Sequence, residues 1–537
     1  MTIDATTETS SPTTTADLVR HWAKVQPDHV ALRWGGTEPQ ELTYRELDER
    51  SSRVANALRA AGVGPGDHVA YLDKNSPEQV EVLFGAAKLN AVPTPVNFRL
   101  APPEIAVIVT DADAKVFIIG VEFADVLDRI AEDLGAIPVV VIGADDAGPE
   151  RPGFARWRDA HPADDPAVLQ AQDDVAYQLY SSGTTGRPKG VQLTQANLQA
   201  GVGLYPELMG LGPTSISLVA MPLFHIGGGG WLLAGIAVGA TNVLVRDIVP
   251  DALVALIERE RISHAFLVPA ALQFMLAAPG IEDRDFSALS SFLYGASPIS
   301  EQVLAASIRT FGCQFLQAYG LTETTGTVVI LPAADHDLEG PNTHRLRAAG
   351  RPVPGSEIRV VDAATGEDAE TGAVGEIWIR SATVMKGYWN LPEATEEAIR
   401  PGGWFRSGDA GYLDEDGYLY LYDRVKDMIV SGGENVYPAE VENVLMAHPG
   451  VADAAVIGVP HDKWGETPKA VIVRAPDEAG STLTEADVIA FCRERLAAFK
   501  CPTSVDWVDA LPRNPSGKIL KKDLREPFWV GRERRVG

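Results

Sequence analysis

Short apolar runs alternate with helical patterns through residues 16–330 of this sequence. Strand-like runs lie at 68–72, 92–96, 115–119, 138–142, 216–220, 241–245 and 264–268. Parallel strands need long crossover connections, which helices supply, so this alternation predicts an α/β fold of parallel sheets covered by helices.

Beyond Gly350 the strand patterns become short and are separated by Gly/Asp turns, which predicts an antiparallel, barrel-like portion. At 537 residues the chain is also too long for a single hydrophobic core, because single cores stop growing at roughly 250–300 residues. We predict a disordered tail at 1–15 and a large N-terminal domain at 16–423, with two parallel-sheet subdomains and a distorted β-barrel. A small mobile α+β domain at 424–537 follows.

The charge balance is strongly acidic, with 73 acidic and 46 basic residues and a net charge of −27. Such a surface repels phosphate backbones, so we expect no nucleic-acid partner. Three cysteines without a metal-type pair fit a reducing cytoplasm. We see no signal peptide and no run of ~20 apolar residues, so we expect a cytoplasmic protein without a transmembrane segment. Weak peripheral membrane contact and a homodimer stay open.

The segment from Tyr180 to Gly190 combines glycines, hydroxyls and a lysine after an apolar run. Glycines let backbone N–H groups approach a phosphate, and hydroxyls and an ammonium add donors. It is not a Walker A loop, because Pro188 and Lys189 precede the last glycine. A polar hairpin turn is the plain alternative. The candidate phosphate contacts are Ser181, Ser182, Gly183, Thr184, Thr185, Gly186 and Lys189.

Four further positions have chemistry suited to a nucleotide. Tyr319 offers a ring for a purine, and Glu323 offers a carboxylate for Mg²⁺ beside phosphates. Asp409 suits the ribose hydroxyls, and Arg424 suits a sugar or a phosphate. Taken singly, residues of these types are also common at helix termini and on protein surfaces, which is the plain alternative for each of them. Lys518 lies in a Gly/Pro loop, where a lysine is usually only solvated.

In their order and spacing these segments resemble the adenylate-forming superfamily of acyl-CoA synthetases, adenylation domains and luciferases. The resemblance rests on Ser182–Gly190, Tyr319–Glu323, Asp409, Arg424 and Lys518, and it spans residues 16–525. The segment at 426–438 looks most like bacterial fatty-acid–CoA ligases.

The resemblance implies that ATP and Mg²⁺ bind here and that an acid is activated as an acyl-adenylate. The Thr184–Lys189 loop then grips the β- and γ-phosphates, and Thr184 and Glu323 hold Mg²⁺. Lys518 bridges the substrate carboxylate and the α-phosphate. The implied catalytic residues are Lys518, Glu323, His225 and Thr184. The implied nucleotide site also includes Gly295, Ala296, Ser297, Gln317, Ala318, Tyr319, Gly320, Thr322, Asp409 and Arg424.

The resemblance further implies a second half-reaction after rotation of the C-terminal domain about Asp423 and Lys426. Rotation withdraws Lys518 and brings in Ser431, Gly432 and Gly433, with Trp464 beside them, so that a thiol reaches the adenylate. The implied hinge residues are Asp423 and Lys426, and the implied contacts of the thiol acceptor are Ser431, Gly432, Gly433 and Trp464. We expect coenzyme A as the acceptor. An acyl-AMP ligase that ignores coenzyme A, a nucleotide-binding module without catalysis and a membrane-associated transporter-ligase are the alternatives.

The acid is expected to lie near His225, whose plain alternative reading is a packed core histidine. Four glycines follow at 227–230, and we expect them to leave volume for an acyl group. The expected pocket residues are His225, Gly227, Gly228, Trp231 and Tyr294. An apolar acid is implied, and we predict a medium- or long-chain fatty acid. The runners-up are an aryl acid, such as a cinnamate or a benzoate, and a sterol side-chain acid.

Overall fold

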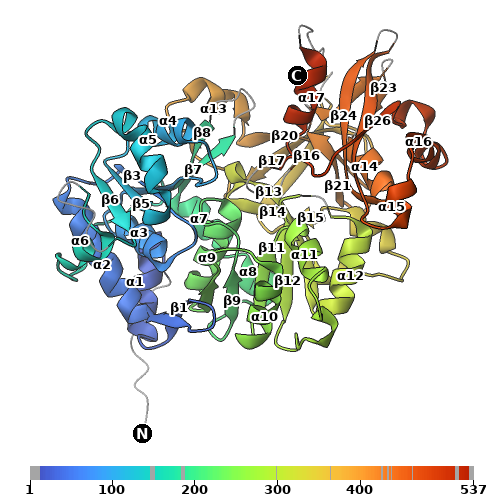
Figure 1. Cartoon of the computed structure of the whole chain (residues 1–537). Helices are drawn as coiled ribbons and strands as arrows, with labels where there is room; N and C mark the ends of the chain where they lie inside the picture. Colours follow the sequence, from blue (N-terminus) through green and yellow to red (C-terminus); the bar gives the residue numbers. More distant parts are fainter. Residues whose placement is uncertain are drawn as a thin grey trace.

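The structure, a computed structural model, describes most of the chain (Figure 1). It describes residues 12–144, 151–182, 188–297, 299–362, 365–424, 427–431, 434–436, 438–461, 464–513 and 519–530. Sheets flanked by helices form the larger part of the molecule, and the segments after residue 427 gather at one corner of it.

The first sheet is four-stranded and parallel, in the order β4-β3-β5-β6. Its strands are β3 (His68–Leu72), β4 (Val92–Pro95), β5 (Val116–Gly120) and β6 (Val139–Ile142). Its helices are α2 (Tyr44–Ala60), α3 (Pro77–Lys88), α4 (Pro102–Asp111), α5 (Ala124–Leu134) and α6 (Phe154–Asp159). Every residue of β3 and β5 is buried, as expected of parallel strands covered on both faces.

The second sheet has nine strands in the order β15-β14-β13-β12-β11-β9-β10-β1-β2, with a parallel centre and antiparallel edges. Its strands are β1 (Val30–Trp34), β2 (Gln40–Thr43), β9 (Ile216–Val219), β10 (Thr241–Leu244), β11 (His264–Leu267), β12 (Ser291–Gly295), β13 (Gln314–Leu321), β14 (Gly326–Leu331) and β15 (Arg351–Pro352). The accompanying helices are α1 (Thr15–Val25), α7 (Gln195–Val202), α8 (Tyr205–Met209), α9 (Ile226–Ala237), α10 (Pro250–Arg259), α11 (Pro269–Leu276) and α12 (Glu301–Phe311).

Two smaller antiparallel sheets complete this larger part. A three-stranded sheet joins β18 (Gly387–Tyr388) to the hairpin of β7 (Val175–Ser182) and β8 (Pro188–Thr194). A five-stranded sheet contains β16 (Ser356–Val361), β17 (Gly375–Ser381), β19 (Ile399–Arg400), β20 (Trp404–Leu413) and β21 (Leu419–Arg424), next to α13 (Pro392–Ala398). The predicted α/β class, with parallel sheets and an antiparallel, curled portion, is confirmed.

The last segments form a mixed sheet with its own apolar core. Its strands are β22 (Ile429–Ser431), β23 (Glu434–Val436), β24 (Val451–His461), β25 (Gly465–Arg474) and β26 (Ser504–Trp507). Its helices are α14 (Pro438–Met446), α15 (Glu478–Thr482), α16 (Glu485–Arg493) and α17 (Lys521–Trp529). The core side chains here come only from residue 429 onward, whereas the other core clusters end at residue 421. A domain boundary at 423–427 agrees with this division and stays a prediction.

A helix that spans a bilayer must be both long and predominantly apolar. Among the described residues, no helix meets both requirements.

Candidate active site

The β7–β8 hairpin carries the candidate phosphate loop. The two strands pair in antiparallel register down to Ser182 opposite Pro188, and the candidate loop is the segment between these two residues. The tip itself, with Gly183, Thr184, Thr185 and Gly186, and the side chain of Ser182 lie outside the described residues. At its base, a Cβ on Gly190 would lie 2.8 Å from Gln178 Nε2 and 3.1 Å from Trp389 Cβ. A side chain at this position would have to displace the Gln178 amide and press on Trp389.

Glu323 lies where three segments far apart in the sequence meet. It follows β13 in a short 3₁₀ turn, Thr322–Thr324. Its Oε1 accepts hydrogen bonds from Ser181 Oγ at 3.2 Å and from Tyr388 Oη at 3.1 Å. Its backbone carbonyl accepts the Met385 N–H at 2.8 Å. The carboxylate is therefore fixed at the base of the phosphate hairpin.

The donor set around Glu323 fits Mg²⁺, a hard cation that prefers oxygen ligands. Within the described ranges, Ser181 and Tyr388 both bond Oε1, which leaves Oε2 available to a cation. No group of three His, Cys, Asp or Glu side chains suited to a metal occurs in the part of the chain that the structure describes. Mg²⁺ in phosphate-binding enzymes is usually held by one or two carboxylates together with substrate phosphates and water, so Glu323 could serve as such a carboxylate.

Tyr319 and Asp409 come together across two sheets. The Tyr319 hydroxyl, from β13, donates to Asp409 Oδ2, on β20, at 2.9 Å. Tyr319 is 8% exposed, so its ring is largely enclosed by protein. The pair places an aromatic side chain next to a carboxylate, and the roles of both toward a purine nucleoside stay predictions.

The loop after β12 lies at the carboxyl end of the second sheet, where open α/β sheets bind ligands. Gly295 pairs with Ala318 of β13, and a Cβ on Gly295 would lie 2.3 Å from the Ala318 carbonyl oxygen. Ala296 has φ +65°, a left-handed conformation that is uncommon for a residue with a Cβ. Ser297 follows directly. Backbone strain of this kind clusters at functional sites, and the place of these three residues in the nucleotide site stays a prediction.

His225 lies immediately before α9, at the end of the second sheet. Its Nε2 is buried and has no hydrogen-bond partner in the described part of the chain. Burial, with a smaller contribution from the nearby Arg99 cation, lowers the pKa of His225 to about 4. The imidazole is therefore neutral at pH 7, and its buried nitrogen can bond a polar group of a ligand.

The glycines after His225 serve close packing as well as space. A Cβ on Gly228 would lie 2.1 Å from the Pro222 carbonyl oxygen, and one on Gly229 would lie 2.9 Å from that of Leu223. Backbone therefore fills the space beside Gly228, and backbone together with the Tyr177 hydroxyl, 2.7 Å from such a Cβ, fills the space beside Gly229, contrary to the expectation that all four open volume. Gly227 instead faces the Phe266 ring, where a Cβ would lie 2.7 Å from Cε1.

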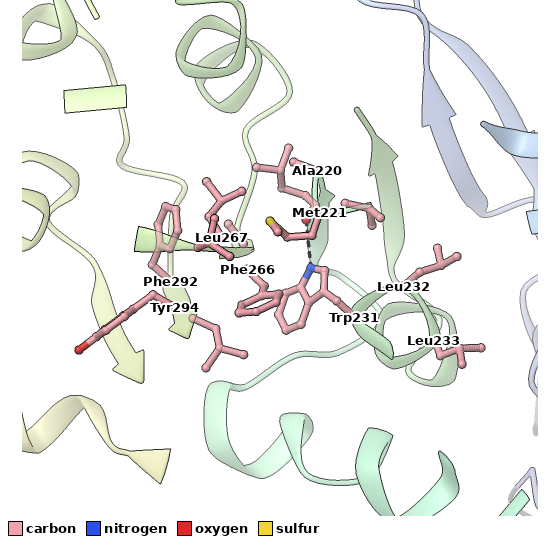
Figure 2. Close-up of a cluster of buried hydrophobic side chains, with 14 of the residues drawn as sticks. Ala220, Met221, Trp231, Leu232, Leu233, Phe266, Leu267, Phe292 and Tyr294 are labelled. Carbon is pink, nitrogen blue, oxygen red and sulfur yellow. Dashed lines mark hydrogen bonds between the residues drawn. The ribbon is translucent and has the colours of Figure 1, made fainter. Parts of the chain in front are cut away.

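Trp231 lies beside Phe266 and Met221 in an apolar cluster (Figure 2). Its indole N–H donates to the Leu218 carbonyl at 3.0 Å, and its ring centroid is 6.2 Å from that of Phe266. This fixed aromatic wall next to Gly227 is the part of the structure that best matches the expected acyl pocket.

Tyr294 points away from this wall, which differs from its expected place in the acyl pocket (Figure 2). Its hydroxyl donates to Gln317 Oε1 at 3.2 Å and lies 3.0 Å from His336 Nε2. The reason is strand alternation: Phe266 is paired with Leu293, so Tyr294, one residue later, is on the opposite face.

The remaining predicted residues belong to the segments near and after the proposed hinge. Lys426, Gly432, Gly433 and Lys518 lie outside the described residues, as do the side chains of Asp423 and Arg424. Ser431 is buried at the end of β22, opposite Glu434. Trp464 is 45% exposed, and its backbone N–H donates to His461 Nδ1 at 3.2 Å. Their roles stay predictions.

Comparison with known proteins identifies the family. The AMP-binding enzyme family matches residues 19–389, and its C-terminal domain matches residues 440–518. The chain belongs to the AMP-binding enzyme family. This confirms the resemblance to adenylate-forming enzymes and makes the protein an enzyme of the acid–thiol ligase class.

Curated relatives of this AMP-binding enzyme differ in their acids and acceptors. It is 42% identical to the fatty acid–[acyl-carrier-protein] ligase ScoC of Streptomyces coeruleorubidus, over 93% of this chain and 94% of the relative. It is 41% identical to a feruloyl-CoA synthase from an Amycolatopsis species, over 94% of this chain and 97% of the relative. The solved structure of a Mycobacterium tuberculosis fatty acyl CoA synthetase is similar to this one, with a TM-score of 0.76 and 34% sequence identity. The match covers 97% of this chain and 99% of that chain.

Tyr388 is a residue of this AMP-binding enzyme that sequence reasoning missed. It contacts Glu323 through its hydroxyl, and Lys189 Nζ lies 4.7 Å from its ring centroid. Residues 387–390 read Gly-Tyr-Trp-Asn, a pattern without an ionised group. Two adjacent aromatic residues after a glycine were the available signal, but their partners lie far away in the sequence.

Proposed function

We propose that this enzyme activates an apolar carboxylic acid with ATP and transfers the acyl group to coenzyme A. In the first step a carboxylate oxygen bonds to the α-phosphorus, the bond to the β-phosphate oxygen breaks, and pyrophosphate leaves. In the second step the thiolate of coenzyme A attacks the acyl carbonyl, and AMP leaves. The products are an acyl-CoA thioester and AMP.

The observation that carries this proposal is that residues suited to phosphate, to Mg²⁺ and to a nucleoside converge at one end of the sheets. Lys189 supports phosphate binding, Glu323 suits Mg²⁺, and the pair of Tyr319 and Asp409 suits the nucleoside. When bound, Mg²⁺ would offset the charge of the phosphates as a carboxylate approaches. Lys518 is proposed to supply a second cation for that approach.

For the acid, we propose a medium- or long-chain fatty acid as the first candidate, supported by relatives named for fatty acids. The aromatic wall of Trp231 and Phe266 favours a second candidate, an aryl acid, because ring pairs gain energy beyond the burial of their area. A relative named for ferulate agrees with it. In both cases neutral His225 is proposed to lie between the acid and the nucleotide.

For the acceptor, we propose coenzyme A, at a site that includes Ser431 and Trp464. An exposed indole, such as that of Trp464, can pack against an extended thiol-bearing arm. The relative named for a carrier-protein substrate indicates that the thiol acceptor varies among similar enzymes, so the acceptor must be tested directly.

The test is a screen of the purified protein with ATP and Mg²⁺ over fatty, cinnamic, benzoic and sterol-derived acids. Pyrophosphate and AMP release are measured with and without coenzyme A. Acid-dependent pyrophosphate release that coenzyme A accelerates supports the proposal. If coenzyme A does not change the turnover, the protein is an acyl-AMP ligase. If no acid stimulates release, while Lys518→Ala and the wild type behave alike, the proposal is wrong.

A further inference from the structure

Tyr388 lies between the metal carboxylate and the phosphate lysine of the proposed site. We propose that Tyr388 is a positioning residue whose hydroxyl orients Glu323 toward Mg²⁺ and whose ring holds Lys189 toward the phosphates. This inference rests on the proposed function, because it concerns how the enzyme assembles its Mg²⁺–ATP site.

The backbone around Tyr388 is fixed from several sides. Strand β18 pairs with β8, with Tyr388 opposite Val191, immediately after the phosphate loop. The Tyr388 N–H donates to Thr395 Oγ1 at 2.9 Å. The Trp389 N–H donates to the Gly190 carbonyl at 2.7 Å, and its indole N–H donates to the Asp111 carbonyl at 2.8 Å. The ring of Tyr388 is thus carried on a short paired strand whose neighbours are also hydrogen-bonded.

The hydroxyl of Tyr388 restricts how Glu323 can turn. A hydroxyl that donates to an ionised carboxylate forms a charge-assisted bond, which is stronger than a neutral one. Tyr388 and Ser181 approach the same oxygen, Oε1, from different strands, at 3.1 and 3.2 Å. With Oε1 held by both, Oε2 is presented in one direction. A cation then binds without first ordering the side chain, and this saves conformational entropy.

The ring of Tyr388 acts on Lys189. The ammonium lies 4.7 Å from the ring centroid, within the range of a cation–π contact. A ring face holds an ammonium without neutralising it, whereas a carboxylate partner would cancel the charge that the phosphates require. One side chain therefore sets the position of both a metal ligand and a phosphate ligand, and its two functions separate chemically into hydroxyl and ring.

The experiment compares Tyr388→Phe, which removes only the hydroxyl, with Tyr388→Leu, which removes the ring as well. Binding of ATP is measured by calorimetry with Mg²⁺ present and with the metal chelated, alongside the Mg²⁺ dependence of pyrophosphate release. Tyr412→Phe, on β20 and stacked on Tyr420, is the matched control. Thermal unfolding checks that each variant folds.

We expect Tyr388→Phe to raise the Mg²⁺ concentration for half-maximal pyrophosphate release by roughly tenfold, the effect of losing one hydrogen bond to a charged group. Its affinity for metal-free ATP should equal that of the wild type, because the ring still holds Lys189. Tyr388→Leu should weaken metal-free ATP binding as well. In a Glu323→Gln background, Tyr388→Phe should have no further effect on the Mg²⁺-dependent part of ATP affinity.

The inference is overturned if Tyr388→Phe leaves the Mg²⁺ dependence unchanged, or if its effect in the Glu323→Gln background is undiminished. It is also overturned if Tyr388→Phe and Tyr388→Leu lower only the unfolding temperature. A failure of the proposed function looks different: the wild type itself would then bind ATP without any acid-dependent release of pyrophosphate.

Discussion

Tyr319 and Asp409 meet although 90 residues separate them in the sequence. Each is an ordinary residue within a strand, and their hydrogen bond brings them together in one candidate nucleoside site. The same holds for Ser181 and Glu323, which are 142 residues apart. At the scale of single residues, the candidate site consists of such distant pairs.

The Asp409 carboxylate should be required for ATP binding. Asp409→Asn removes the charged acceptor that Tyr319 uses and that we propose the ribose hydroxyls also use. Because a hydrogen bond to a charged group contributes about 1.5–3 kcal/mol, we expect ATP affinity to fall roughly tenfold to a hundredfold. Calorimetric titration with ATP measures it. Asp416→Asn, an exposed residue paired with Arg345, should leave the affinity unchanged. Equal affinities for Asp409→Asn and the wild type would remove Asp409 from the site.

Two partly buried histidines should make the protein sensitive to acid. Burial lowers the pKa of His225 to about 4, and it lowers that of His336 to about 4 as well. The unfolded chain, with a His pKa near 6.5, takes up these protons first, so stability is lost as the pH falls from about 6.5 to 4. The unfolding midpoint, measured between pH 7 and 4, should therefore drop. His336→Gln should flatten this dependence; an unchanged slope would contradict the assignment.

At the scale of elements, a buried lysine ties α3 to α2. Lys88 is fully buried, and its Nζ lies 2.6 Å from Asp48 Oδ1, 2.7 Å from Ser52 Oγ and 2.9 Å from Asp165 Oδ2. Asp165 is also held by Arg20 of α1, at 2.8 Å. Three helices of the first part of the chain are thus joined by one charge network.

Removing the charge of Lys88 should destabilise the protein strongly. Lys88→Met leaves Asp48 partly buried without its cation, and breaking a buried pair costs about 3–5 kcal/mol. Chemical denaturation measures this loss. Lys115→Met, which breaks a surface pair with Asp113, is the matched control and should change stability by at most about 1 kcal/mol. Similar losses for both variants would show that burial of the network is unimportant.

At the scale of the whole molecule, two sets of apolar cores divide near the proposed hinge. Ile118 lies in the core of the first sheet, and Ile472 lies in the core of the last one. Both side chains are fully buried. Segments with separate cores can unfold separately, since each buries its own apolar surface.

We therefore expect two transitions in differential scanning calorimetry. Ile118→Ala and Ile472→Ala each remove a buried side chain of the same size, at a cost of about 2–5 kcal/mol. Each substitution should lower the midpoint temperature of one transition and leave that of the other unchanged. A single transition that both variants lower together would argue against separate domains at 16–423 and 424–537.

The sequence by itself determined the class of the fold and the family. Alternating apolar runs and helices specify parallel strands because both patterns are local, and the expected strand at 68–72 is β3 as observed. The capping box of Thr43 and Glu46, which opens α2, is equally local, because its two residues are three positions apart. The glycine- and hydroxyl-rich loop and Glu323 could be recognised for the same reason: their chemistry is written in neighbouring residues.

Only the tertiary structure decided which side chains meet and which way they face. A one-residue step along β12 turns Tyr294 away from Trp231 and Phe266, and the close approach of backbone fills the space beside Gly228. Tyr388 gains its place from pairing with a strand almost 200 residues earlier, far beyond the reach of any local pattern. Local patterns encode secondary structure and motif chemistry, whereas contacts between distant segments depend on the packing of the whole chain.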